Sequence, residues 1–99
     1  MRSDILKLIG RSYVMDENGV SLPEETSRGV YCRVGSVSAS EFFEGARSGL
    51  RPEIRFTMFR FDYDNEEVCE YEGARYRIYR TYISGDYIEL YCELGKGVE

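Results

Sequence analysis

Few residues in this 99-residue chain could carry out chemistry. It has no histidine, which excludes catalytic triads and dyads built on histidine and histidine metal ligands. Cys32, Cys69 and Cys92 are odd in number and widely spaced, with no Cys-x-x-Cys pair, so cysteine and histidine cannot supply the four ligands of a structural zinc site. We therefore expect all three cysteines to be reduced and to pack as small hydrophobic side chains, as in a cytosolic protein.

Carboxylates are the remaining candidates for catalysis or metal binding. The first acidic residues of segment 62–74 have the spacing of a calcium-binding loop. However, Glu67 stands where an EF-hand needs glycine, and Gly73 stands where it needs glutamate. The chain also lacks a glycine-rich phosphate loop and a Gly-x-Ser-x-Gly motif. We expect no metal, no cofactor and no enzymatic activity.

The charge is concentrated in one segment. The formal net charge is −5, and residues 62–74 hold six acidic side chains and no basic one: Asp62, Asp64, Glu66, Glu67, Glu70 and Glu72. An acidic protein is a poor general nucleic-acid binder, and a solvated hairpin end is the simplest explanation of this segment. The first apolar run, residues 5–9, is short and interrupted by Lys7, so neither a secretory signal nor a membrane span is expected.

Surface aromatic residues are better candidates for function. The chain has nine tyrosines and no tryptophan, and alternating strands must turn some tyrosines outward. Tyrosine is enriched at interfaces, but it is also favoured in sheets for its strand propensity alone. The tyrosines predicted as possible partner contacts are Tyr79, Tyr82, Tyr87 and Tyr91.

Apolar and polar residues alternate with period two along most of the chain, which indicates strands. The expected strands are residues 4–15, 29–37, 53–63, 68–71, 74–83 and 87–94, with a link at 20–26 that contains Pro23. A change of apolar face near Met58 predicts a β-bulge or two-sided burial. In the last strand Ile88, Leu90, Cys92 and Leu94 are expected to point inward, and residues 95–99 to fray. We predict a mainly β fold: one domain over residues 1–99, a small antiparallel barrel or sandwich of about six strands.

One helical segment, about residues 38–50, interrupts this pattern. Ser38 and Glu41 have capping-box spacing, and Gly49 and Pro52 should end the helix. Gly45 weakens a helix that is already short, so it should need tertiary or partner contacts. An apolar stripe at helical spacing is expected from Ala39, Phe42, Phe43, Ala46 and Leu50.

Two features of this insert suggest an interface. A wide stripe could bury both Phe42 and Phe43, or one of them could reach a partner. Arg47, Arg51 and Arg55 form a local positive patch that is either solvated or in contact with carboxylates or phosphates. The predicted interface segment comprises Ser38, Glu41, Phe42, Phe43, Arg47, Leu50 and Arg51.

Three stretches of the sequence resemble a known family. Residues 32–53 read CRVGSVSASEFFEGARSGLRPE, residues 59–63 read FRFDY, and residues 70–82 read EYEGARYRIYRTY. Together they resemble the head-closure proteins, also called stoppers or head–tail adaptors, of long-tailed phages and prophages. The resemblance covers essentially the whole chain and rests on the ordered set of residues, since no single motif in it is catalytic.

That resemblance implies a small non-enzymatic β-barrel with a helix or long loop between its second and third strands. Such proteins form a ring beneath the portal, usually dodecameric, which helps to close the DNA channel and gives the tail its docking platform. The implied partners are the portal protein, a tail-completion or tail-terminator protein, further copies of the chain, and packaged DNA without sequence-specific binding. The implied location is the virion head–tail interface, after the bacterial host cytoplasm, with residues 38–52 at the channel lumen or a subunit interface.

Other functions stay open at this point. The main alternative is a generic small β-barrel protein-binding module that uses its tyrosines and the Phe42–Phe43 helix. An acidic inhibitor that mimics DNA is less favoured, because its carboxylates would have to spread over a long face, whereas six lie in one run.

Overall fold

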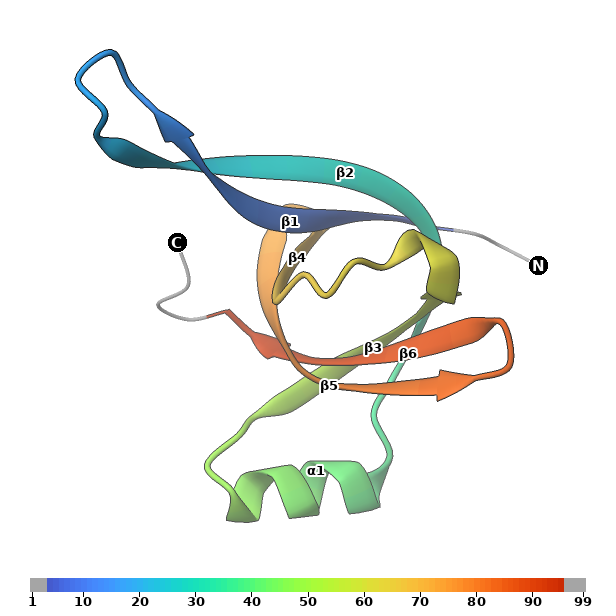
Figure 1. The fold of residues 1–99 in the computed structure, drawn as a ribbon. Helices are drawn as coiled ribbons and strands as arrows, with labels where there is room; N and C mark the ends of the chain where they lie inside the picture. The colour runs from blue at the N-terminus through green and yellow to red at the C-terminus, as the bar shows by residue number, and fades with distance from the viewer. Residues whose placement is uncertain (1–3, 96–99) are drawn as a thin grey trace.

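The computed structural model describes residues 4–95, and it is mainly β (Figure 1). Six antiparallel strands close into a barrel in the order β1-β2-β3-β6-β5-β4, with the helix between β2 and β3, as predicted. Fraying was predicted from Gly95 onward, but the Gly95 N–H donates to the Arg75 carbonyl at 2.8 Å; the rest of that prediction, residues 96–99, lies outside the described residues. The elements are β1 (Asp4–Met15), β2 (Ser21–Gly35), α1 (Ala39–Arg47), β3 (Pro52–Phe59), the 3-10 turn η1 (Arg60–Asp62), β4 (Val68–Tyr71), β5 (Ala74–Ser84) and β6 (Tyr87–Leu94).

Alternate side chains of every strand fill the barrel. Phe56 is fully buried, and its ring meets those of Tyr71 and Tyr76 edge to face at centroid distances of 5.3 and 6.0 Å. Side chains fill the interior of a barrel this small, so the fold is held by burial of apolar surface. The buried cluster comprises Leu6, Leu8, Val30, Cys32, Phe56, Met58, Cys69, Ile78, Ile88, Leu90 and Cys92.

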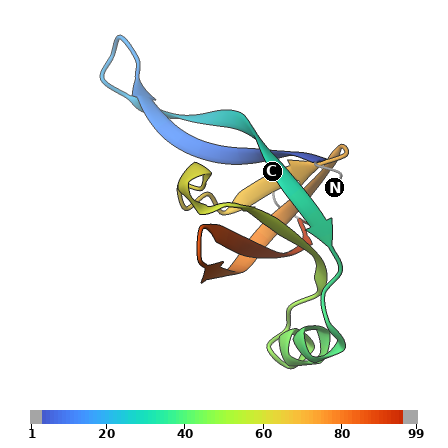
Figure 2. The ribbon, with the colours of Figure 1, turned by 90° about the vertical axis from the view of Figure 1, so that its right-hand side faces the viewer.

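β1 and β2 extend well beyond the barrel. β4 pairs with β1 only over residues 7–9, and β3 pairs with β2 only over residues 32–35, so the outer parts of β1 and β2 pair only with each other. We call residues 10–26 the arm; it projects from one side of the barrel in Figures 1 and 2. Asp16 Oδ1 closes its turn by accepting the backbone N–H groups of Asn18 and Val20.

The prediction of a link over residues 20–26 was therefore wrong, because these residues belong to β2. Pro23 is tolerated because no third strand pairs with the outer edge of the arm, so no ladder hydrogen bond is lost there. β2 also ends at Gly35, two residues before the predicted end.

Three further strand predictions need correction. The third strand ends at Phe59, and the change of apolar face comes from the η1 turn that follows rather than from a bulge at Met58. The register shifts lie instead between Pro52 and Ile54 and between Ile78 and Arg80. Leu94 is exposed rather than inward, because it lies at the end of β6.

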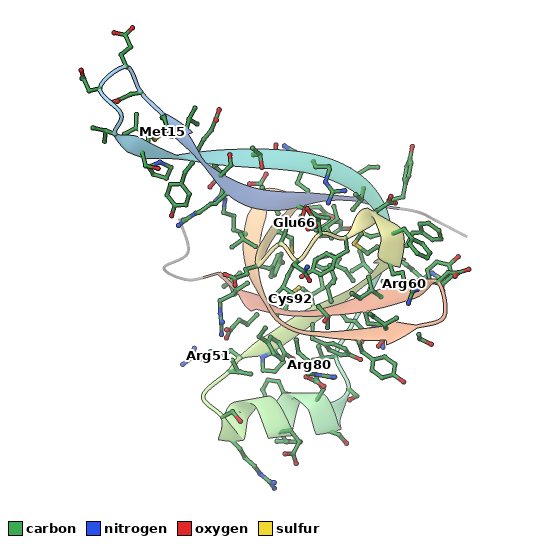
Figure 3. All side chains as sticks on the ribbon, viewed as in Figure 1. Met15, Arg51, Arg60, Glu66, Arg80 and Cys92 are labelled. Carbon is green, nitrogen blue, oxygen red and sulfur yellow. The ribbon has the colours of Figure 1, made fainter. Side chains whose placement is uncertain are left out.

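All three cysteines are buried free thiols inside the barrel, as expected, and Figure 3 labels Cys92 there. The Sγ atoms of Cys69 and Cys92 are 3.9 Å apart, and their contact together with burial raises the pKa of Cys92. Burial also raises the pKa of Cys32 to about 11. Because the thiolate is the reactive form, these thiols should be inert in the folded protein.

We therefore expect an aromatic disulfide reagent to leave the native protein unlabelled at neutral pH. After denaturant is added, all three thiols should react at the rate of free cysteine. Mass spectrometry before and after denaturation measures the number of modified thiols. Rapid labelling of the native protein would contradict the closed barrel.

Candidate functional site

Both ends of the helical insert are fixed by their own hydrogen bonds. The Ser38 side chain accepts the Glu41 N–H at 3.1 Å, which caps the first turn. At the other end the N–H groups of Gly49 and Leu50 bond to the carbonyls of Ala46 and Gly45, with Gly49 at a φ of +81°. This is a Schellman motif, in which glycine adopts the left-handed conformation at low steric cost. The sequence thus encodes both ends of α1, at 39–47 rather than 38–50.

The helix approaches the barrel through a glycine rather than through its apolar stripe. Gly45 is the buried residue of α1, and a Cβ built on it would lie only 2.4 Å from Cγ of Pro52. The predicted stripe instead faces solvent: the exposed fractions of Phe42 and Phe43 are 47% and 63%, and Ala39 and Ala46 are also exposed. Burial of both phenylalanines by a wide stripe is therefore contradicted.

A polar contact holds the start of α1 against the barrel. Glu41 accepts hydrogen bonds from the Tyr79 hydroxyl, at 2.6 Å, and from the Arg80 guanidinium, both on β5. The Arg80 guanidinium also lies over the Tyr91 ring, 4.0 Å from its centroid, and the Tyr91 hydroxyl donates to Glu89 at 2.6 Å. Arg80 is labelled between the barrel and α1 in Figure 3. We call Glu41, Tyr79 and Arg80 the latch.

The latch predicts that Glu41→Gln loosens the helix. Hydrogen bonds to a charged group each contribute about 1.5–3 kcal/mol, so amides of α1 should exchange with solvent roughly tenfold faster or more. Glu44→Gln is the matched control, because the Glu44 carboxylate bonds to the exposed Arg47 of the same helix. Hydrogen–deuterium exchange of residues 39–47 measures the effect. Equal protection in both variants would contradict the latch.

The latch also makes the position of α1 dependent on pH. Burial raises the pKa of Glu41, but hydrogen bonds from Arg80 and Tyr79 outweigh it, and the pKa lies below its ordinary value of 4.5. A group whose pKa is lowered by folding contributes stability above its unfolded pKa and loses it as the pH falls through the folded value. The latch is therefore intact at neutral pH and should open only in acid below pH 4.5.

Phe42, one of the two exposed phenylalanines, lines a shallow groove on α1, and Phe43 packs against Phe42. Their rings meet edge to face with centroids 5.6 Å apart. The groove has a volume of about 530 Å³, and its lining comprises Phe42, Ala46, Gly49, Leu50 and Arg51. A solvent-facing aromatic pair beside an apolar groove is typical of a surface that a partner covers.

The three arginines of the insert do not form one patch. Arg47 and Arg51 are exposed, and the Arg51 backbone N–H donates to Glu93 at 3.1 Å, which ties the exit of the insert to β6. Arg55 is half-buried on β3 beside Gly35, where a Cβ would meet its guanidinium at 2.7 Å. Only Arg47 and Arg51 are thus available at the surface of the insert.

The four candidate tyrosines divide into two pairs. Tyr82 and Tyr87 are exposed, so they could meet a partner without rearrangement. Tyr79 and Tyr91 are half-buried, and their hydroxyls already bond to Glu41 and Glu89. All four stay predictions as partner contacts, but Tyr79 has a role within the chain that the sequence pattern did not indicate.

Sequence reasoning missed a second aromatic surface, at the end of the barrel near η1. The ring of Phe59 lies 5.0 Å from that of Phe61 and 6.3 Å from that of Tyr87, and all three residues are exposed. The Arg60 guanidinium covers the Phe61 ring at 4.8 Å. The apolar alternation through residues 59–63 was the available signal, but it was interpreted as strand.

The acidic segment is partly paired rather than fully solvated. The Glu66 carboxylate accepts hydrogen bonds from the Arg28 guanidinium at 2.6 Å and from the Asp64 backbone N–H at 2.8 Å. The Glu70 carboxylate forms ion pairs with Lys7 at 3.8 Å and with Arg75 at 3.6 Å. Glu66 is labelled on the loop that crosses the barrel in Figure 3. The Glu66 pair ties the loop before β4 to β2, and the Glu70 pairs tie β4 to its neighbours β1 and β5, so part of the negative charge serves the fold.

In residues 4–95, no group of three histidine, cysteine or acidic side chains is placed to hold a metal ion. No helix of that range is long and apolar enough to cross a membrane. Comparison with models of known protein families gives no match, and comparison with curated proteins gives none either.

Proposed function

We propose that this chain is a structural virion protein of head completion. It forms a ring beneath the portal, closes the DNA channel and provides the docking platform for the tail. The resemblance of residues 32–53, 59–63 and 70–82 to head-closure proteins supports the proposal, as does a closed barrel with a helix between β2 and β3. The protein acts by contact and carries out no reaction.

The observation that carries the proposal is the exposed aromatic face of α1. Phe42 and Phe43 leave large apolar area in water in the single chain, although the latch and Pro52 hold the helix in place. An exposed apolar face on an ordered element is expected where a partner or a further copy covers it. In the assembled ring, residues 38–52 face the channel or a neighbouring subunit.

A second function is favoured by the aromatic surface of Phe59, Phe61 and Tyr87. A generic protein-binding module would use this surface to hold one partner, without a ring. The two functions differ in stoichiometry, because a module binds its partner singly and a head-closure protein adds a whole ring.

Light scattering after size-exclusion chromatography distinguishes the two functions. The probe is the purified portal protein encoded in the same genome. The free chain should elute as a monomer in dilute solution, and the portal peak should gain the mass of one complete ring. A folded chain that adds no mass to an assembly-competent portal would contradict the proposal.

A further inference from the structure

The arm is a surface that the single chain leaves without cover. Six residue pairs, from Gly10–Thr26 to Met15–Ser21, lie outside the barrel and pair with no third strand. Tyr13 and Met15 share one face of this ribbon and are 70% and 67% exposed, and Val14 and Leu22 pair on the other face and are also exposed. A two-stranded ribbon is marginally stable in water by itself, so apolar residues on both of its faces indicate a partner.

The arm is also acidic. Residues 10–26 carry four acidic side chains, Asp16, Glu17, Glu24 and Glu25, and one basic side chain, Arg11, which lies opposite Glu25 at the base of the arm. Arg75 neutralises Glu25 at the base of the arm with a hydrogen bond of 3.0 Å. The charge that stays uncompensated therefore lies toward the tip, beside the exposed apolar residues.

The groove on α1 has the opposite charge. It is apolar at Phe42, Ala46 and Leu50, and its one charged lining residue is Arg51, since Arg47 pairs with Glu44 of the same helix. Figures 1 and 2 both place the arm and α1 on opposite sides of the barrel, and the molecule is 51 Å long. Met15 and Arg51 are labelled far apart in Figure 3. Two complementary surfaces on opposite sides suit contact between different copies of the chain.

We propose that the arm of one copy docks into the α1 groove of the next copy. Tyr13 and Met15 supply the apolar contact, and Glu17, in the turn that follows Met15, faces Arg51. The contact joins two different surfaces, so it is heterologous and repeats from copy to copy until a ring closes. This inference rests on the proposed function for the closed ring and deepens it by naming the subunit interface.

Engineered cysteines test the contact in concentrated solution. Tyr13→Cys, on the arm, is mixed with Ala46→Cys, in the groove, and a short thiol-specific cross-linker is added; the native thiols are buried. The mixed pair should give dimers, while either variant alone should not, because a heterologous contact brings two different sites together. Tyr82→Cys replaces Ala46→Cys in the matched control, since Tyr82 is exposed on β5 outside the groove.

A charge and packing test uses the same readout. Adding Met15→Ser and Glu17→Arg to the Tyr13→Cys chain should lower the yield of dimers by roughly tenfold, because apolar anchors and charge pairs dominate such contacts. Adding Arg51→Glu to the Ala46→Cys chain should recover part of that loss. Equal yields of dimers from the Tyr13→Cys/Ala46→Cys pair and from the Tyr13→Cys/Tyr82→Cys control, or no cross-link at all, would overturn the inference.

Electron microscopy of the portal complex separates this inference from the proposed function. A ring below the portal without arm–groove cross-links leaves the proposed function standing and overturns the named interface. Arm–groove cross-links in solution, with no ring on the portal, support the interface and contradict head closure. An arm that cross-links to the portal in place of the next copy also overturns the inference.

Discussion

A chain carrying both Phe42→Asp and Phe43→Asp should fold normally and fail to assemble. Both rings are exposed, and neither helps to fill the barrel, so the free energy of unfolding should change by less than about 1 kcal/mol. Assembly should suffer far more, since loss of a buried aromatic anchor typically weakens an interface by about 2 kcal/mol or more, which is over tenfold in affinity. Infectious particles should not form.

Thermal unfolding by circular dichroism and binding to the portal measure the two effects separately. Tyr31→Asp is the matched control, because Tyr31 is an exposed aromatic residue on β2 that belongs neither to the insert nor to the predicted partner contacts. Its portal binding should stay closer to that of the parent chain. Cooperative unfolding lost in the Phe42→Asp/Phe43→Asp chain would show instead that the helix belongs to the core.

The largest effect on stability should come from Phe56→Ala. Phe56 is fully buried at the centre of the barrel, against Tyr71 and Tyr76. Removal of such a ring leaves a cavity that costs about 3–5 kcal/mol, and small domains are stable by only about 5–15 kcal/mol. The variant should be substantially unfolded at 37 °C or lose most of its resistance to urea.

Urea denaturation followed by circular dichroism measures this loss. Phe59→Ala is the matched control, since Phe59 lies three residues along the same strand and is exposed. It should shift the midpoint only slightly. Equal midpoints for the two variants would contradict the position of the core along β3.

The helical insert is held in place by contacts along its whole length. Its ends are fixed by the Ser38 cap and the Schellman motif, and its body rests on Pro52 through Gly45. The latch then holds its first turn to β5. Because this ordered helix exposes its phenylalanines, they can contact another surface. In the proposed ring they face the channel or a neighbouring subunit.

Much of the fold could be predicted because burial sets the pattern of the strands. Val30 and Cys32 on β2, and Ile88 and Leu90 on β6, alternate with polar residues and do point into the barrel. The arm was predicted only in its first half, as the end of the expected strand over residues 4–15. It packs against no core, so its sequence carries no clear alternation, and Pro23 favoured a link.

The site was harder to predict because its contacts join distant parts of the chain. Glu41 and Tyr79 are 38 residues apart, and their separate patterns indicated a helix cap and an outward tyrosine. Gly45 was expected to weaken the helix, whereas it permits the close approach to Pro52. The apolar stripe predicted burial on the barrel. Hydrophobic periodicity identifies the apolar face of a helix, but it does not identify the surface that packs against that face.

Electron cryo-microscopy of the chain bound to its portal can show whether a ring forms. We expect a closed ring of barrels beneath the portal, with residues 38–52 of each copy at the channel lumen or against the next subunit. Single copies bound to the portal without a ring, or a portal with no added density beside a folded chain, would contradict it and favour the binding module.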